Sequence, residues 1–352
     1  MGDSGAKRFF GSARALYQRM WAAMAAFRSS CVWWSTVERG LLQALQIDGR
    51  VAFSLVGAVL GVSDQTVARR YARLRNEAGV RVIGAVWPEA VGRQLWLVRV
   101  RCVPEAVAGL ARALAKQAET SWVQIASGGA EVLCMVQAVT GTPAAESTVL
   151  SRLPRTPRVT GVSAHRVLHP FFGGSESPLT KNGPLTAEQC AQLSPPTAKR
   201  VTGPVELSTQ DNALLKALAL DGRAGFRSLA TATGWSQTTV RRRLAELRSG
   251  GVVYFDVDVD PALLGSWTSA GLWLTVAPGE LAAAGEALAE HPQVSFAAAT
   301  TGVSNLYASV QCPTGTALYE YLTGPVAALP GLLSVETAPS MRVVKGASPI
   351  VG

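Results

Sequence analysis

The spacing of apolar and polar residues predicts one helical unit that occurs twice. Residues 34–75 align with residues 207–248 at a constant offset of 173, without a gap and with 19 identities in 42 positions. The identities include Leu41/Leu214, Asp48/Asp221, Gly61/Gly234 and Val67/Val240. Identity of this extent in one register is far above chance, so we interpret the chain as a duplication of a whole unit.

Three helices are predicted in each copy. A Ser-Thr-x-acid pattern at 35–38 and at 208–211 forms a capping box, which starts a helix. Leucines at helical spacing then give each first helix an apolar stripe, and Asp-Gly-Arg ends it at 48–50 and 221–223. A second short helix should begin near Phe53 or Phe226. A third should span about 64–77 or 237–249.

The turn between the second and third helices has a characteristic composition. It reads Gly-Val-Ser at 61–63 and Gly-Trp-Ser at 234–236, where glycine permits a tight turn and serine can cap the next helix. Small residues four positions earlier, Gly57 and Ala230, let the two helices approach closely. This spacing is typical of a helix-turn-helix unit.

Short β-rich runs follow each helical unit. They lie at 80–83, 95–100, 122–126 and 132–138, and again at 252–255, 272–276, 294–298 and 306–310. Alanine-rich helices are predicted at 105–118 and 279–290, and the last helix and strand are clearer in the second copy, at 316–328 and 332–337. The order β-α-β-β-α-β predicts a ferredoxin-like domain in each half, so the fold class is α+β.

Two segments have no counterpart in the repeat. Residues 1–33 carry five basic residues against Asp3 and several aromatic residues, which indicates a basic amphipathic extension unless the start is misassigned. Residues 170–207 hold six prolines and four glycines, which indicates a linker between the halves.

Composition narrows the classes of function. The formal net charge of +9 favours a polyanionic partner. Five scattered cysteines without a C-x-x-C motif suit a reducing cytosol, so we expect a cytoplasmic protein. His165 and His169 lie four apart but lack a third ligand, and we interpret them as surface residues. No run approaches the 18 apolar residues of a membrane span, and we expect no metal, cofactor or membrane partner.

The third helices carry the candidate chemistry. Val67, Tyr71 and Leu74 share one face, as do Val240, Leu244 and Leu247, so the opposite faces are polar and cationic. Because a helix fits the major groove and arginine bridges guanine bidentately, we expect these faces to contact double-stranded DNA. The candidate contacts are Ser63, Gln65, Thr66, Arg69, Arg70, Arg73, Ser236, Thr238, Thr239, Arg241, Arg242 and Arg243.

The arginines differ in position. Arg69 and Arg242 are the best groove candidates, whereas Arg70 and Arg243 lie nearer the core edge, where a phosphate contact or an internal salt bridge suits them better. The alternative is that all of them form only a solvated helix face.

These motifs resemble the Lrp/AsnC transcription regulators. The resemblance rests on Asp-Gly-Arg at 48–50, the two turns, the Thr-Val-x-Arg-Arg stretches at 66–70 and 239–243, and the ferredoxin-like domains. It implies a winged helix-turn-helix and an effector-binding domain that dimerises and senses amino acids or other small molecules. Because family members usually carry one copy, one chain here would form the pseudo-dimer, with assembly into a homo-oligomer implied as well.

The predicted boundaries follow from this resemblance. They are a basic extension at 1–33, helix-turn-helix domains at 34–80 and 208–252, ferredoxin-like regulatory domains at 81–169 and 253–345, and the linker at 170–207. In the family the effector lies near the loop between the central strands. By position this implies Gly128, Gly129 and Glu131 in one half and Thr301, Gly302 and Asn305 in the other. Turn glycines between strands explain the same residues equally well.

Two further readings stay open. Siroheme decarboxylases also resemble paired Lrp/AsnC-type subunits, but residues 81–87 lack the Arg-Phe-Gly and the histidine- and tyrosine-bearing motif associated with them. No acid/base pair, activated nucleophile or phosphate loop stands out, so we expect a protein that is not an enzyme. Alternatively, one repeat has lost its DNA contacts and serves mainly in dimerisation.

Overall fold

The computed structural model describes residues 34–139, 149–196 and 203–347. The predicted N-terminal extension at 1–33 therefore lies outside the described residues. The chain divides into a unit of residues 1–39 and a unit of residues 40–352. The fold described below is that of the second unit, together with the start of the first helix. No helix among the described residues has the length and apolarity to cross a membrane.

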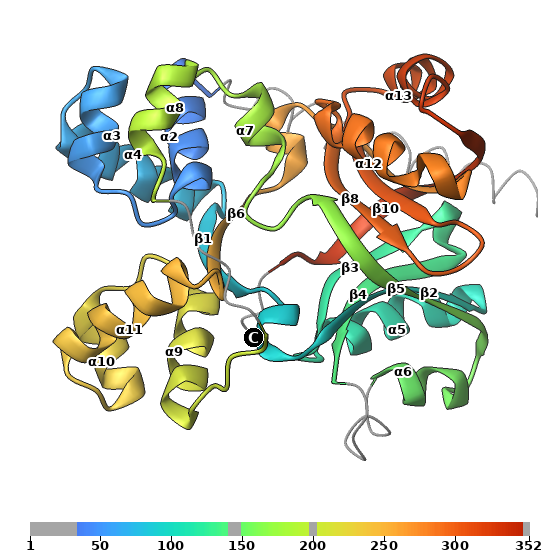
Figure 1. Ribbon diagram of the computed structural model, residues 1–352, viewed down its shortest axis with the longest axis horizontal. Coiled ribbons are helices and arrows are strands. Elements are labelled where there is room, and N and C mark those ends of the chain that lie inside the picture. The colour runs from blue at the N-terminus through green and yellow to red at the C-terminus, as the bar shows by residue number, and fades with distance from the viewer. Residues whose placement is uncertain (1–33, 140–148, 197–202, 348–352) are drawn as a thin grey trace, which may run out of the picture. The chain divides into compact units, whose positions relative to one another are not determined.

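Each repeat begins with three helices (Figure 1). They are α2 (Thr36–Ile47), α3 (Phe53–Leu60) and α4 (Asp64–Glu77), then α9 (Thr209–Leu220), α10 (Phe226–Thr233) and α11 (Gln237–Ser249). The predicted bounds of both third helices are confirmed. Gly61 and Gly234 end the second helices with φ of 67° and 74°, in the left-handed region that glycine adopts without strain. A Cβ on Gly57 would lie 2.6 Å from the Val62 carbonyl oxygen, which explains the small residue there.

The strand after each third helix pairs with its counterpart in the other repeat. β1 (Arg81–Val86) and β6 (Val253–Asp258) form an antiparallel two-stranded sheet, in which Ile83 lies opposite Asp256. These two positions are equivalent in the repeat, since they differ by 173. Figure 1 shows the two helical groups on either side of this sheet. The pairing of β1 with β6 therefore joins the two helix-turn-helix domains to each other.

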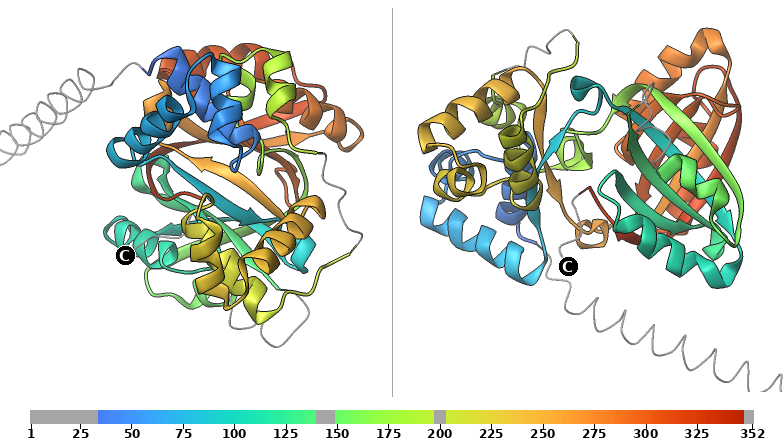
Figure 2. Two further views of the ribbon diagram at one scale, coloured as in Figure 1. Left: turned by 90° about the vertical axis from the view of Figure 1, so that its left-hand side faces the viewer. Right: turned by 90° about the horizontal axis from the view of Figure 1, so that it is seen from below.

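The remaining strands close into one eight-stranded barrel, in the order β10-β3-β4-β2-β5-β8-β9-β7 (Figure 2). The first half supplies β2 (Gln94–Cys102), β3 (Thr120–Ala126), β4 (Glu131–Ala138) and β5 (Val159–Phe172). The second supplies β7 (Thr268–Val276), β8 (Val294–Thr300), β9 (Leu306–Cys312) and β10 (Leu332–Lys345). The long strands β5 and β10 each cross over, because β5 pairs with β8 and β10 with β3.

The predicted β-α-β-β-α-β order is confirmed in each half. The helices are α5 (Pro104–Ala115) and α6 (Val149–Arg152), then α12 (Leu281–Glu290) and α13 (Gly315–Tyr321). Each half buries its own apolar cluster between strands and helices, around Val100 and Leu114 in the first and Leu274 and Leu288 in the second. A third cluster on the opposite strand faces includes Leu97, Leu133, Trp273 and Tyr307. The α+β class with two repeats is thus confirmed.

The segment predicted as a linker is partly helical. It contains α7 (Pro178–Asn182) and α8 (Ala187–Leu193), which Ser177 and Thr186 cap at their N-termini. Gln43 accepts a hydrogen bond from the Leu185 amide at 2.8 Å, and Gln189 donates to the Val59 carbonyl at 2.8 Å. The predicted linker also starts too early, because β5 continues through Pro170 to Phe172. Hydrogen bonds to α2 and α3 give the segment a fixed place on the first helix-turn-helix domain.

Candidate nucleic-acid interface and ligand-binding loops

Serine residues fix where the two third helices begin. The Ser63 hydroxyl accepts a hydrogen bond from the Thr66 amide at 3.2 Å, and the Ser236 hydroxyl accepts one from the Thr239 amide at 3.1 Å. In both helices the serine and threonine hydroxyls are 2.9 Å apart. Two of the predicted contact residues, Ser63 and Ser236, therefore also act as N-caps, which sets the position of the first helical turn.

The predicted inner and outer faces of the third helices are confirmed. Three apolar side chains are buried in each helix, namely Val67, Tyr71 and Leu74 in α4 and Val240, Leu244 and Leu247 in α11. Gln65 and Thr238 are exposed in the first turns. Each helix thus presents a polar face beside its cap, while its other face closes the core of the domain.

On α4 the three predicted arginines share one region of surface. Arg69 and Arg73 are exposed and Arg70 is half-buried. Their side chains border a single hollow. Three of the cationic side chains of this helix are therefore neighbours on its surface, which suits contact with a polyanion.

On α11 the arginines are held by acidic residues. Arg242 pairs with Glu246 at 2.9 Å, although its side chain is 71% exposed. Arg243 is half-buried and binds the buried Asp211 carboxylate through Nε at 2.7 Å and Nη2 at 3.0 Å. Hydrogen bonding to Asp211 raises the pKa of Arg243. Of the two roles expected for Arg243, the structure contains the internal salt bridge.

The two third helices therefore differ in charge at equivalent positions. Arg73 in α4 corresponds to Glu246 in α11 at the offset of 173. Arg241, whose equivalent is Ala68, lies over the Phe226 ring at 4.6 Å. As a result α4 presents an exposed arginine where α11 presents a carboxylate that neutralises Arg242.

The first candidate effector loop has a buried acidic base. Glu131 is 2% exposed and accepts hydrogen bonds from Arg99 Nε at 3.1 Å and from the Ser127 hydroxyl at 2.6 Å. Gly128 and Gly129 have φ of 69° and 85° and form the tip. The carboxylate therefore holds the loop in place, and the two glycines are the part that faces outward.

The second candidate loop is tied to the first half of the chain. Asn305 donates to the Val276 carbonyl at 2.8 Å and accepts from the Val276 amide at 2.9 Å, so both ends of its amide bind backbone. The Thr301 hydroxyl accepts from the Arg166 amide at 2.9 Å. A Cβ on Gly302 would lie 2.5 Å from His165 Nδ1, so glycine is required where β5 passes. Each loop thus lies against the last strand of the other half.

Comparison with known proteins identifies the chain. The AsnC-type helix-turn-helix domain matches residues 37–75 and 207–248, and the Lrp/AsnC ligand binding domain matches residues 269–350. The HTH-type transcriptional regulator LrpA1 of Halobacterium salinarum is 30% identical over 126 residues, which are 88% of that protein and 36% of this chain. The chain belongs to the Lrp/AsnC family of transcription regulators.

A second regulator and one solved structure are also similar to this Lrp/AsnC protein. The HTH-type transcriptional regulator FL11 of Pyrococcus horikoshii is 28% identical over 142 residues, covering 91% of that protein and 40% of this chain. The crystal structure of the siroheme decarboxylase NirDL is similar over 88% of this chain and 92% of its own, with a TM-score of 0.58 and 14% identity. At that identity the likeness shows a shared fold for this Lrp/AsnC chain and nothing about its activity.

Sequence reasoning missed an ionic cluster around a buried arginine in this Lrp/AsnC protein. Arg99 is 9% exposed, binds Glu131 and also donates to Glu336 at 2.7 and 3.0 Å, and lies over the Trp273 ring at 5.0 Å. The only signal was a lone arginine between Val98 and Val100 in a strand-like run. Its two acidic partners lie 32 and 237 positions away, so no local pattern connects them.

Proposed function

We propose that this Lrp/AsnC regulator recognises specific double-stranded DNA sequences with α4 and α11. The observation that carries the proposal is the repeated arrangement of a left-handed glycine, a capping serine and an exposed polar helix face. A helix of this kind can enter the major groove, where arginine, glutamine and threonine side chains reach base edges and phosphates. In the proposed complex Arg69 and Arg242 contact bases, and Arg73 and Arg241 contact phosphates.

The unequal charges of the two helices support an asymmetric operator. Non-identical contact residues, such as Gln65 and Thr238, favour non-identical half-sites. Because the two helices belong to one pseudo-symmetric unit, we expect the half-sites to be roughly 10 bp, or a multiple, apart. Each helix carries four arginines, against two acidic residues in α4 and one in α11, but Glu246 and Asp211 pair with Arg242 and Arg243 of α11. The two helices should therefore contribute unequally to phosphate-driven affinity.

The experiment is a titration against labelled DNA from upstream of the protein's own gene, with unrelated competitor DNA, at two salt concentrations. Arg69→Ala with Arg242→Ala should abolish the specific component. The matched control is Arg112→Ala with Arg155→Ala, which removes two exposed arginines outside the helix-turn-helix domains. Equal loss of binding in both double variants would mean that only net charge matters, and unchanged promoter affinity would refute base recognition.

We also propose that a small, amino-acid-like effector modulates this binding at one or both loops between the central strands. The match of residues 269–350 to the Lrp/AsnC ligand binding domain supports this assignment. Since Glu131 and Asn305 are engaged with protein groups, backbone atoms near Gly128, Gly129 and Gly302 should supply the contacts, helped by Thr301. A thermal-shift screen with the twenty amino acids, repeated with Gly129→Val, tests this. A ligand that stabilises both proteins equally binds elsewhere.

A second candidate is a siroheme decarboxylase, with which the fold shared with NirDL is compatible. His165 is the histidine to examine, because it stacks on Trp273 at a centroid distance of 4.9 Å and its Nδ1 lies 2.8 Å from the Thr301 carbonyl. Added siroheme should leave its Soret band unshifted if the protein is a regulator. A saturable shift that His165→Ala removes would favour the enzyme.

A further inference from the structure

The Asp-Gly-Arg motifs of the two repeats exchange hydrogen bonds. Arg50 donates to the carbonyl oxygens of Gly222 at 2.6 Å and Ala224 at 3.0 Å. Arg223, its equivalent, donates to the carbonyls of Gly49 at 2.7 Å and Val51 at 3.0 Å. The sequence pattern indicated only a helix end here. In the structure each arginine instead binds the backbone of the opposite repeat.

The last turns of the third helices join the same exchange. Arg75 of α4 pairs with Asp221 at 3.0 Å, and Arg248 of α11 pairs with Asp48 at 2.8 Å. These contacts are equivalent as well, because both pairs of positions differ by 173. Each recognition helix is therefore bonded at its C-terminal end to the Asp-Gly-Arg loop of the other domain.

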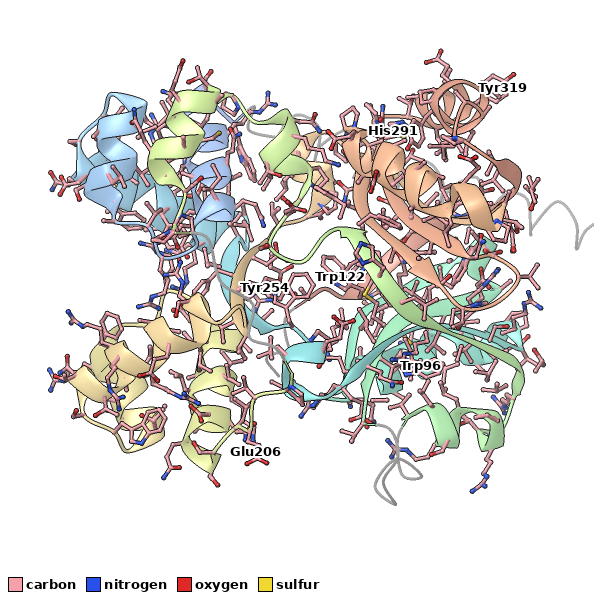
Figure 3. All side chains as sticks on the ribbon, viewed as in Figure 1. Trp96, Trp122, Glu206, Tyr254, His291 and Tyr319 are labelled. Carbon is pink, nitrogen blue, oxygen red and sulfur yellow. The ribbon has the colours of Figure 1, made fainter. Side chains whose placement is uncertain are left out.

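Close packing fixes the loops that receive these bonds. A Cβ on Gly49 would lie 2.5 Å from the Phe255 Cβ, and one on Gly222 would lie 2.9 Å from the Ile83 carbonyl carbon. The Gly222 amide also donates to the Val82 carbonyl at 2.7 Å. Both loops thus lie directly on the β1–β6 sheet, which includes Tyr254 (Figure 3). The rings of Tyr254 and Trp87 are 4.9 Å apart and tilted by 39°.

Aromatic rings and carboxylates support the buried arginines. Arg50 lies over Phe226 at 5.0 Å, and Arg223 lies over Phe53 at 4.3 Å. Burial, followed by repulsion from Arg223, lowers the pKa of Arg50. Two guanidinium groups this near each other need compensating charge, which Asp48 and Asp221 supply. Without the carboxylates, the hydrogen bonds to the carbonyl oxygens would remain, but the repulsion between the two guanidinium groups would be uncompensated.

We propose that this reciprocal exchange sets the separation and orientation of α4 and α11, and hence the spacing between half-sites that the chain accepts. The inference rests on the proposed function. Arg75 lies six residues after Arg69 on one rigid helix, or about 9 Å along its axis. A displacement of the opposite loop would therefore move the base-reading side chain with it. Asp48, Arg50, Arg75 and their equivalents are positioning residues that need not touch DNA.

The test is the double variant Asp48→Asn with Asp221→Asn. Each aspartate also accepts a hydrogen bond from the amide two residues later, at 2.9 Å, and asparagine keeps that acceptor while removing the charge. Binding is measured on a series of DNAs whose half-sites are separated by 0 to 10 added base pairs, and on a lone half-site. Arg152→Gln, which removes an ion pair with Glu119 in the barrel half, is the control.

Wild type and Arg152→Gln should bind best at one spacing and lose about tenfold in affinity when two base pairs are added. The double aspartate variant should lose less than about threefold on the same change, with lone half-site affinity unchanged. Arg75→Lys with Arg248→Lys, which keeps both charges, should retain most of the preference. An unaltered spacing preference in the aspartate variant, or an equal loss on the lone half-site, would overturn the proposal.

A distance measurement separates this proposal from DNA binding itself. Spin labels at Ala72→Cys and Ala245→Cys, both exposed and equivalent, report the distance between α4 and α11 when Cys31 and Cys190 are serine. The wild-type distance distribution should be narrow and should broaden in the aspartate variant. The same distribution in both proteins refutes positioning. Broadening without any base-specific binding upholds positioning and refutes the proposed function.

Discussion

Replacing Glu246 by glutamine should strengthen DNA binding. In α11 this carboxylate pairs with Arg242 at 2.9 Å and with Arg243 at 3.2 Å, and the equivalent residue in α4 is Arg73. The Glu246 side chain is 43% exposed, and in the proposed complex it lies on the surface that faces the phosphates. Removing it frees Arg242 and removes a negative charge from the interface.

The size of the gain in DNA affinity can be estimated from the repulsion between this carboxylate and a phosphate. Two like charges about 4 Å apart repel by about 1 kcal/mol in water, which corresponds to about fivefold in Kd at low salt. Removing the carboxylate adds one net positive charge to the interface, which should make the slope of log K against log salt steeper by up to about 0.9. The exposed ion pair itself contributes only about 0.3–0.5 kcal/mol to the fold, so the variant should remain folded.

The assay is a DNA titration at four or more salt concentrations. Glu320→Gln in α13 is the matched control, because it removes one exposed carboxylate outside the helix-turn-helix domains. Glu246→Gln should bind more tightly with the steeper slope, and Glu320→Gln should bind as wild type. Equal gains in both variants would show a global charge effect, and no gain in either would refute the placement of α11 against DNA.

Two further predictions concern stability. Gly57→Ala should destabilise the fold by about 1–3 kcal/mol in urea unfolding, because its Cβ would lie 2.6 Å from the Val62 carbonyl oxygen; Gly109→Ala, in open space on α5, should instead stabilise by about 0.5–1 kcal/mol. Equal effects of the two substitutions would contradict the close approach at the turn. Burial raises the pKa of Asp256 to about 7, so the folded state holds this carboxyl in its protonated form more strongly than the unfolded state does. The resulting stability is fully present below about pH 4 and is lost as the pH rises through about 7. The residue keeps partial exposure, so we expect a loss of about 2 kcal/mol, roughly half of what a shift of about three pH units implies. Asp256→Asn should remove that part of the dependence, and parallel unfolding free energies for wild type and variant between pH 4 and 8 would argue against it.

Local patterns predicted most of the fold. Helical spacing and capping serines gave the bounds of α4 and α11, and short β-rich runs located the barrel strands other than β5, because these signals depend on neighbours a few positions apart. The pairings between repeats were not predictable in this way. Arg50 and its carbonyl partners are separated by more than 170 positions, and no local sequence pattern indicates that they are in contact.

The candidate contacts on the third helices were predictable as a face but not as individual roles. Arg242 and Arg243 are adjacent in the sequence, and the acidic residue that each one binds in the fold determines which of them is left exposed. Asp211, which the capping box had already explained, also binds Arg243 from 32 residues away. Similarly, Asn305 was a plausible ligand residue by position, and only the fold revealed that the Val276 backbone occupies both ends of its amide.

The contact between Arg99 and Trp273 bears on how the two halves recognise each other. In the barrel, Arg99 of β2 lies opposite Ser163 of β5, and Trp273 of β7 lies opposite Glu336 of β10. The positions of Ser163 and Glu336 differ by 173, the offset of the repeat. The cation and the ring therefore occupy matching places in the two halves. Two copies of the first half would bring guanidinium against guanidinium, and two copies of the second would bring indole against indole. This contact favours pairing of unlike halves, and the covalent link supplies one of each at any dilution.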